Sequence, residues 1–189
     1  MVEQVGVTAT ERGRCTLRRI DYEDAFLLSI DPGDRWTAEH WARSFLEGAP
    51  NEIRRGLRGV WMMLGLRLES PTSPVPSVLG WRIHRRTPEM VLLGADSRFG
   101  MSGQLLIMID GQSLIFATFA QQTNPLLRAI WTGVTSRHLR MVRYLLHRAH
   151  TESVGRSPQS SLQKPSRALQ PTTDDSDHED RRDEGVRAS

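Results

Sequence analysis

The sequence predicts an α+β domain in which an antiparallel sheet packs against one long helix. Two observations predict this class. Short apolar runs separated by turn residues occupy residues 78–123, and an amphipathic pattern with helical periodicity follows over residues 124–150. A chain of 189 residues has room for one such domain and a tail. A sheet must bury at least one face, so we expect the long helix to cover it.

One strand and a first short helix are expected ahead of the sheet region. The strand lies within residues 15–30, where apolar side chains alternate on one parity: Tyr22, Phe26 and Leu28. A turn follows at residues 31–35. Thr37 is suited to cap a helix that ends before Gly48, because its hydroxyl can accept a hydrogen bond from the first turn.

A second short helix is predicted from Asn51 onward. Its apolar residues recur at the spacing of one helical face: Ile53, Leu57, Val60, Trp61 and Leu64. Gly56 and Gly59 weaken this helix, since glycine is a poor helix former. Residues 69–77 hold three prolines and are expected to form a loop.

The sheet itself is expected to contain four further strands. The apolar runs that predict them are residues 78–86, 89–97, 103–110 and 112–122. Thr87–Pro88 separates the first pair of runs. Asp110–Gly111 separates the second pair and predicts a type I′ turn, in which both central residues have positive φ.

The last predicted element is a long helix over residues 124–150. Asn124 is a good cap and Pro125 suits the first helical position. One continuous stripe runs along it: Leu127, Ile130, Trp131, Val134, His138, Met141, Val142, Leu145 and Ala149. This stripe is the surface that we expect to face the sheet.

These elements divide the chain into three parts. Residues 1–14 are expected to be a flexible N-terminus, and residues 15–150 form the folded domain. Residues 151–189 are expected to be a disordered tail, because they are rich in Ser, Pro, Gln, Asp and Arg, and lack aromatic residues from 153 onward.

Composition excludes several classes of protein. The net charge of +3 is a weak field, and no basic cluster carries interleaved aromatics, so we expect no nucleic-acid partner. Cys15 is the single cysteine, which excludes an intrachain disulfide and fits a reducing compartment. No signal peptide and no membrane span are apparent. We therefore expect a cytoplasmic protein; the oligomeric state is left open.

The segment LLGADSRFGMSGQLLIMIDGQSLIFATFAQQTNPLLRAIWTGVTSRHLRMVRYLLHRA, together with the element order, resembles a family of uncharacterised bacterial domains. These domains belong to the START-like superfamily, which includes polyketide cyclases, and their last helix carries a histidine about seven residues after a tryptophan. Here that pair is Trp131 and His138. The resemblance covers about residues 15–150. The sequence shows five strands, whereas the full sheet of that superfamily has seven.

The resemblance implies a helix-grip fold, in which a curved antiparallel sheet grips the C-terminal helix, with two short helices after the first strand. It also implies an apolar cavity between sheet and helix, which in that superfamily holds lipids, sterols, polyketides or other bulky apolar ligands. Because one fold hosts many functions, this is an analogy.

Two residues are candidates for acid–base chemistry. His138 lies on the inner stripe of the long helix, where its imidazole could orient a ligand or accept a proton; the alternative is a histidine bonded to a backbone carbonyl. Asp96 ends a buried strand and could pair with Arg98, Arg82 or His138. The alternative, which we favour, is that Asp96 bonds the backbone of its own turn.

The remaining pocket candidates are Gln121, Trp131 and Met141. Gln121 and Gln122 end the last strand and one of them must face inward, unless the strand end is simply solvated. Trp131 and Met141 would line a cavity if one exists, and otherwise pack the core. The histidines are scattered without a carboxylate at ligand spacing, so we expect no metal and no cofactor.

Three hypotheses for function follow. The first is a small domain that binds a hydrophobic or aromatic small molecule between the sheet and the C-terminal helix. The second is a cyclase- or dehydratase-like enzyme that uses His138 and Asp96. The third is a non-catalytic accessory or interaction domain with a filled core.

Overall fold

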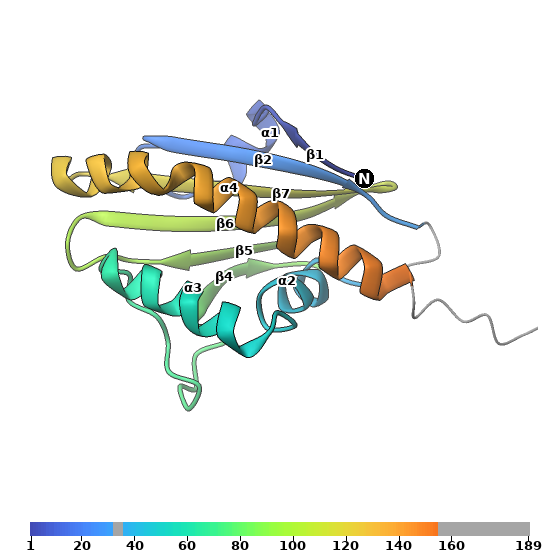
Figure 1. Ribbon diagram of the computed structural model, residues 1–189. Helices are drawn as coiled ribbons and strands as arrows, with labels where there is room; N and C mark the ends of the chain where they lie inside the picture. The colour runs from blue at the N-terminus through green and yellow to red at the C-terminus, as the bar shows by residue number, and fades with distance from the viewer. Residues whose placement is uncertain (32–35, 155–189) are drawn as a thin grey trace, which may run out of the picture. The chain divides into compact units, whose positions relative to one another are not determined.

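The structure is a computed structural model, and it describes residues 1–31 and 36–154. Within these residues, seven strands form one open sheet in the order β1-β2-β7-β6-β5-β4-β3, and every neighbouring pair is antiparallel (Figure 1). The strands are β1 (Val2–Val5), β2 (Tyr22–Ser29), β3 (Ser77–Val78), β4 (Trp81–Arg86), β5 (Met90–Ala95), β6 (Met101–Asp110) and β7 (Ser113–Gln122). The helices are α1 (Ala9–Arg14), α2 (Ala38–Leu46), α3 (Asn51–Met63) and α4 (Pro125–Val154). The predicted α+β class, with a long C-terminal helix, is confirmed.

The two faces of the sheet are covered differently. Helices α2, α3 and α4 lie on one face, which we call the inner face (Figure 1). Residues of β2 and β7 alternate between the faces: Phe26 and Phe116 belong to the cluster under the helices, while Ala117 and Phe119 pack on the outer face. The outer cluster is completed by Val5 and by the segment that leads into β2, namely Val7, Cys15, Leu17 and Ile20.

Two strands and one helix were not expected. Residues 1–14, expected to be flexible, form β1 and α1. A capping box stabilises the start of α1. The backbone N–H of Thr8 donates to the Glu11 carboxylate, and the Thr8 hydroxyl accepts a hydrogen bond from the backbone N–H of Thr10. The proline-rich loop ends in β3, which the two-residue turn Leu79–Gly80 joins to β4. Both turn residues have positive φ (48° and 91°), as a type I′ turn requires.

The hairpin between β6 and β7 differs from the prediction in its turn. The pairing of Asp110 with Ser113 makes Gly111 and Gln112 the two central residues, one position later than expected. Of these two, only Gly111 has positive φ, at 58°. This is the pattern of a type II′ turn, because glycine stands at the first central position.

The two short helices form as predicted but pack unequally. Thr37 caps α2 by accepting a hydrogen bond from the backbone of His40 (3.2 Å), and α2 buries Trp41, Ala42 and Phe45. In contrast, no residue between Asn51 and Met63 is buried, although α3 has a strong apolar stripe. The stripe of α3 therefore lacks the close packing that an amphipathic helix normally finds.

Helix α4 runs four residues beyond the predicted end at residue 150, to Val154. It lies over β1, β2 and β7, while α2 packs against α4 and against β5 and β6. The predicted disordered tail, from residue 155 onward, lies outside the described residues. Among the described residues, no helix is long and apolar enough to cross a membrane.

Asp21 ties the start of β2 to the end of β7 and to the first turn of α4. Its carboxylate accepts a hydrogen bond from the backbone N–H of Gln122 (2.8 Å) and pairs with Arg19 (2.8 Å) and Arg128 (3.3 Å). The hydrogen bond from Gln122, followed by the two arginines, holds the pKa of Asp21 below its ordinary value.

We expect the Asp21→Asn variant to lower the free energy of unfolding at neutral pH by about 1 kcal/mol. A group whose pKa is lowered by folding stabilises fully above its ordinary pKa of about 4, and this contribution disappears as the pH falls through the lowered value. Urea unfolding at neutral and acidic pH should therefore show the gap between wild type and variant narrowing on acidification. Asp110→Asn, in the exposed hairpin turn, is the control; a pH-independent gap for Asp21→Asn would contradict the prediction.

Candidate functional site

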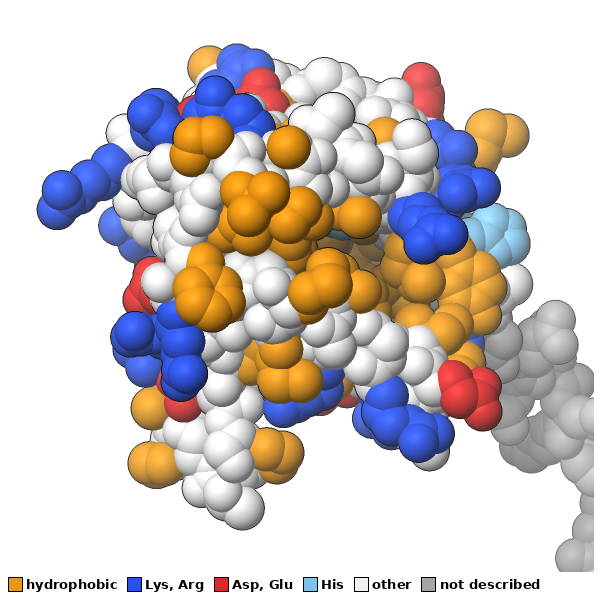
Figure 2. Space-filling model, turned by 60° about the vertical axis from the view of Figure 1, so that its left-hand side comes forward, with side chains coloured by type: hydrophobic (Ala, Val, Ile, Leu, Met, Phe, Trp, Pro, Cys, Tyr) orange, Lys and Arg blue, Asp and Glu red, His pale blue; other side chains and the backbone are white. Residues whose placement is uncertain are grey.

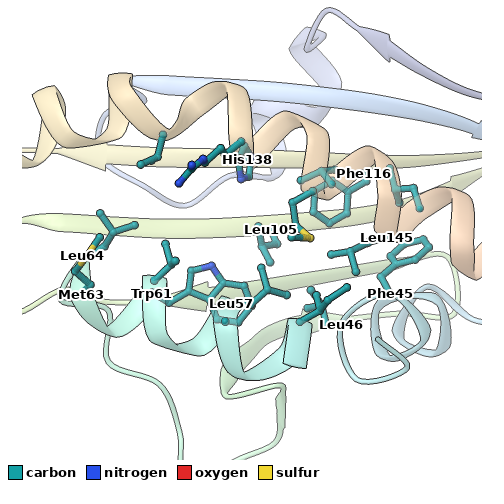
Figure 3. Close-up of a pocket in the computed structure, with 18 of the residues that line it drawn as sticks. Phe45, Leu46, Leu57, Trp61, Met63, Leu64, Leu105, Phe116, His138 and Leu145 are labelled. Atoms are coloured by element: carbon teal, nitrogen blue, oxygen red, sulfur yellow. The ribbon is translucent and has the colours of Figure 1, made fainter. Parts of the chain in front are cut away.

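A cavity of about 580 Å³ lies between the inner face of the sheet and the helices α3 and α4. Figure 3 shows side chains from both helices converging on this space, and Figure 2 shows the surface hollowed where hydrophobic side chains gather. Among the described residues, the polar or charged side chains that line it are Glu52, Arg137 and His138. The apolar walls consist of Phe45, Leu46, Ile53, Gly56, Leu57, Val60, Trp61, Met63, Leu64, Leu105, Phe116, Trp131, Val134, Met141, Val142, Leu145 and Leu146.

The cavity forms because α3 packs on the sheet through only part of its face: Trp61 contacts Trp81 of β4, with ring centroids 5.3 Å apart, and no residue of α3 is fully buried. All five residues of its predicted apolar face line the cavity: Ile53, Leu57, Val60, Trp61 and Leu64. Leu105 of β6 and Phe116 of β7 form the floor from the sheet side. The apolar stripe of α3 therefore borders an open space, while Trp61 and Leu64 also pack against the core.

A cluster of polar side chains lies beside this cavity, under the middle of α4. Tyr22 and Asp24 are two residues apart on β2, so both point to the inner face, and Asp24 is paired with Thr118 of β7. The side chain of His138 projects from α4 towards Asp24 and Thr118. Its Nε2 lies 2.9 Å from Oδ2 of Asp24 and 3.4 Å from Oγ1 of Thr118.

Asp24 is the centre of the cluster. Its side chain is 3% exposed, and Oδ2 accepts hydrogen bonds from the hydroxyl of Tyr22 (2.6 Å) and from Nε2 of His138. The other oxygen, Oδ1, is buried and has no partner among the described residues. A buried carboxylate is costly unless it is hydrogen-bonded, so the two donors, Tyr22 and His138, offset part of the cost of burying Asp24.

The electrostatics of the cluster keep Tyr22 protonated. Burial is the largest cause, and the hydrogen bond to Asp24 and the negative charge of Asp24 add to it; together they raise the pKa of Tyr22 far above its usual value. The hydroxyl therefore remains a donor to Asp24 throughout the physiological range.

Asp24 also determines which nitrogen of His138 carries the proton. A carboxylate only accepts hydrogen bonds, so Nε2 must be the protonated nitrogen in the contact with Oδ2. In neutral His138, Nδ1 then keeps its lone pair. Within the described residues Nδ1 makes no hydrogen bond, and it is not fully buried. His138 can thus present a hydrogen-bond acceptor to the cavity that it lines.

Two other predicted pocket residues do line the cavity. Trp131 is 8% exposed and packs edge-on against the ring of Tyr22 and at a tilt against His138, with ring centroids 5.1 Å apart in both cases. Met141 lies one turn beyond His138 on the same face of α4. Trp131 therefore packs against two members of the polar cluster, Tyr22 and His138.

Asp96 lies elsewhere. It is exposed just after β5 and does not line the cavity. Its carbonyl oxygen accepts a hydrogen bond from the backbone of Arg67 (2.7 Å), and the next residue, Ser97, accepts one from the backbone of Phe99 (2.9 Å). Asp96 belongs to a corner between strands, and the carboxylate beside His138 is Asp24.

The glutamine that faces inward is Gln122 and not Gln121. Gln122 is 2% exposed and continues the inner parity of Phe116 and Thr118, whereas Gln121 is half-buried on the opposite parity. Neither residue lines the cavity. The strand parity of residues 22–28 carried the signal that could have found Asp24, because it places this carboxylate on the same face as Tyr22 and Phe26.

Within the described residues, no three His, Cys, Asp or Glu side chains gather closely enough to hold a metal ion. No model of a known protein family matches the chain, and no curated protein matches it. Among solved structures, the chain is similar to the solution NMR structure of a structural genomics target from Arthrobacter aurescens. The two share 8% identity over 82% of this chain and 100% of the other, with a TM-score of 0.36. That likeness is too weak to indicate fold or function.

We expect His138→Leu to lower the free energy of unfolding by about 2 kcal/mol, because Asp24 would keep its buried charge with one donor fewer. Replacing both residues, Asp24→Leu with His138→Leu, removes the buried charge and should cost less than His138→Leu alone. Urea unfolding measures both changes. His147→Leu, an exposed histidine on the same helix, serves as the control; a double variant less stable than His138→Leu would refute the assignment.

Proposed function

We propose that this protein binds a hydrophobic or aromatic small molecule in the cavity between the sheet, α3 and α4. The observation that carries the proposal is the cavity itself, with a volume of about 580 Å³ and walls that are apolar apart from three residues. Binding sites for small molecules typically enclose roughly 300–1,000 Å³ and combine apolar walls with a few polar groups.

The packing of α3 supports the same proposal. An amphipathic helix in a folded domain normally buries its apolar stripe, yet α3 buries none of its residues. Apolar surface gains about 25 cal/mol for each Å² removed from water. A ligand between α3 and the sheet would supply the contacts that the apolar stripe of α3 lacks.

The polar group of the ligand is expected at His138. Because Asp24 holds the proton on Nε2, neutral His138 offers Nδ1 as an acceptor at a wall whose other α4 residues, apart from Arg137, are apolar. A ligand with an apolar body and one hydroxyl or N–H group fits this arrangement. Trp131 and Met141 add an aromatic and a pliable surface beside it.

The proposal agrees with the resemblance to the START-like superfamily, and we propose that the sheet and α4 correspond to the helix-grip arrangement, in a cytoplasmic protein. Seven strands are present where five were expected, which removes one difference from that superfamily. The cavity also counts against the third hypothesis, since an accessory domain with a filled core would not leave α3 without a buried residue.

We expect Gly56→Phe to weaken ligand binding by at least about tenfold. Gly56 lines the cavity, and a Cβ atom at this position meets no atom within 4 Å, so a phenyl ring there has room to occupy the edge of the cavity. The measurement is titration with an environment-sensitive naphthalene sulfonate dye, supported by native mass spectrometry of the purified protein.

Gly59→Phe is the matched control, because Gly59 lies on the same helix in open space but does not line the cavity. Both substitutions replace a helical glycine and should leave thermal stability unchanged or slightly higher. Dye affinity should fall for Gly56→Phe alone. Failure of the wild type to bind dye or any copurified molecule, or equal dye affinity in both variants, would overturn the proposal.

A second candidate function is proton-transfer catalysis on the bound ligand, in the cyclase or dehydratase class. The contact of 2.9 Å between His138 and Asp24 favours it. Nδ1 of His138 would take a proton from a carbon next to a carbonyl group, Asp24 would stabilise the imidazolium that forms, and the proton would return to the enolate. In this mechanism Asp24 takes the role that the second hypothesis from the sequence gave to Asp96.

We expect the wild-type protein in D₂O to incorporate deuterium into an apolar aryl ketone next to its carbonyl group, as followed by mass spectrometry. His138→Gln should abolish this exchange, and Asp24→Asn should slow it by about tenfold or more, because proton transfer by a positioned base contributes roughly 10²–10⁴-fold. His147→Gln should match the wild type. Exchange at the buffer rate in the wild type would exclude this candidate while leaving ligand binding open.

A further inference from the structure

Five exposed hydrophobic side chains gather at one end of the molecule. They come from the end of α3, the loop between β5 and β6, and the first turn of α4, and Figure 1 shows these three segments at the same end. Figure 2 shows hydrophobic side chains grouped beside the hollow on this side. We call this surface the end patch; its members, which are 44–66% exposed, are Val60, Met62, Met63, Phe99 and Leu126.

Contacts of the loop between β5 and β6 hold the three segments of the end patch against one another. The ring of Phe99 covers Gly65, just after α3, so closely that a Cβ atom at Gly65 would collide with it. The backbone of Arg98 donates to the carbonyl of Gly65 (2.9 Å). On the other side of the loop, the backbone of Thr123 donates to the carbonyl of Gly100 (2.8 Å), which places the start of α4 against the same loop.

The end patch adjoins the cavity. Val60 and Met63 belong to both the end patch and the cavity wall. Both line the cavity, and Val60 is 44% exposed and Met63 61% exposed. An apolar ligand leaving the cavity past these two residues would therefore meet the end patch before it met bulk water. Exposed apolar patches beside a ligand site mark surfaces that bind a partner or a membrane.

The charge around the end patch is positive. Arg67 and Arg98 are exposed at the corner under Phe99 and form no ion pair within residues 1–31 and 36–154. Asp96 is the one acidic residue of that corner, between Ala95 and Gly100. The cavity lining itself holds one charge of each sign, Arg137 and Glu52. Apolar side chains bordered by arginines complement an anionic lipid surface.

We propose that the end patch docks on an anionic membrane surface, where the cavity exchanges its apolar ligand with the bilayer. The inference rests on the proposed function for the nature of that ligand, but docking itself can be measured without it. Methionine and phenylalanine would enter the headgroup region, and the arginines would contact lipid phosphates. Transfer at the membrane surface spares an apolar ligand the cost of crossing water.

The test is co-sedimentation of the full chain with vesicles of phosphatidylcholine alone and of phosphatidylcholine mixed with phosphatidylglycerol. We expect binding to the mixed vesicles that weakens with added salt. Met62→Ser with Phe99→Ser should reduce that binding by about tenfold or more. Arg67→Gln with Arg98→Gln should reduce it by about tenfold, and only on the anionic vesicles.

Tyr144→Ser is the matched control, because Tyr144 is 47% exposed on α4 but outside the end patch. Circular dichroism checks that each variant is folded, and dye titration checks that its cavity still binds. Absence of vesicle binding in a wild type that binds dye would overturn this inference and leave the proposed function intact. Light scattering tests the other possible occupant, a second copy of the chain. A dimeric wild type and a monomeric Met62→Ser, Phe99→Ser double variant would show that the end patch binds this second copy and would overturn the membrane proposal.

Discussion

The packing of α4 across the inner face of the sheet is the constraint on which the rest of the structure depends. The helix lies over β1, β2 and β7 and contacts α2, which in turn packs against β5 and β6. These contacts bury Val142, Leu146 and Ala149 in the main core. With α2 and α4 in place, α3 contacts the remaining part of the sheet through Trp61, and the space beside this contact is a cavity with apolar walls.

The polar cluster under α4 has a cost that packing alone does not explain. Burying the carboxylate of Asp24 is unfavourable, and a buried charged cluster seldom stabilises a fold more than apolar residues of similar volume do. The cluster does give α4 a defined position on β2 and β7, and it orients His138 at the cavity wall. Positioning of a functional group is thus the physical role that best fits its geometry.

The inner parity of β2 illustrates how much of the site could be predicted. Tyr22 and Phe26 were recognised as one face of a strand, and the same alternation places Asp24 between them. His138 was recognised from the helical stripe. The pairing of the two residues could not be predicted, because they are 114 residues apart and meet only through the register of β2 with β7 and the placement of α4. Asp96 occupied an equally plausible strand position but stands at an exposed corner.

By itself, the sequence determined the local elements of this protein. Periodicity of two and of 3.6 residues specified β2, the four strands β4–β7 and the helices α2, α3 and α4, and the cap at Thr37 specified where α2 begins. Only the tertiary structure decided which carboxylate meets His138, which glutamine faces inward, and that the stripe of α3 borders a cavity. Local periodicity reports which face of an element is apolar, but the neighbour that covers this face, or leaves it open, depends on how distant elements pack together.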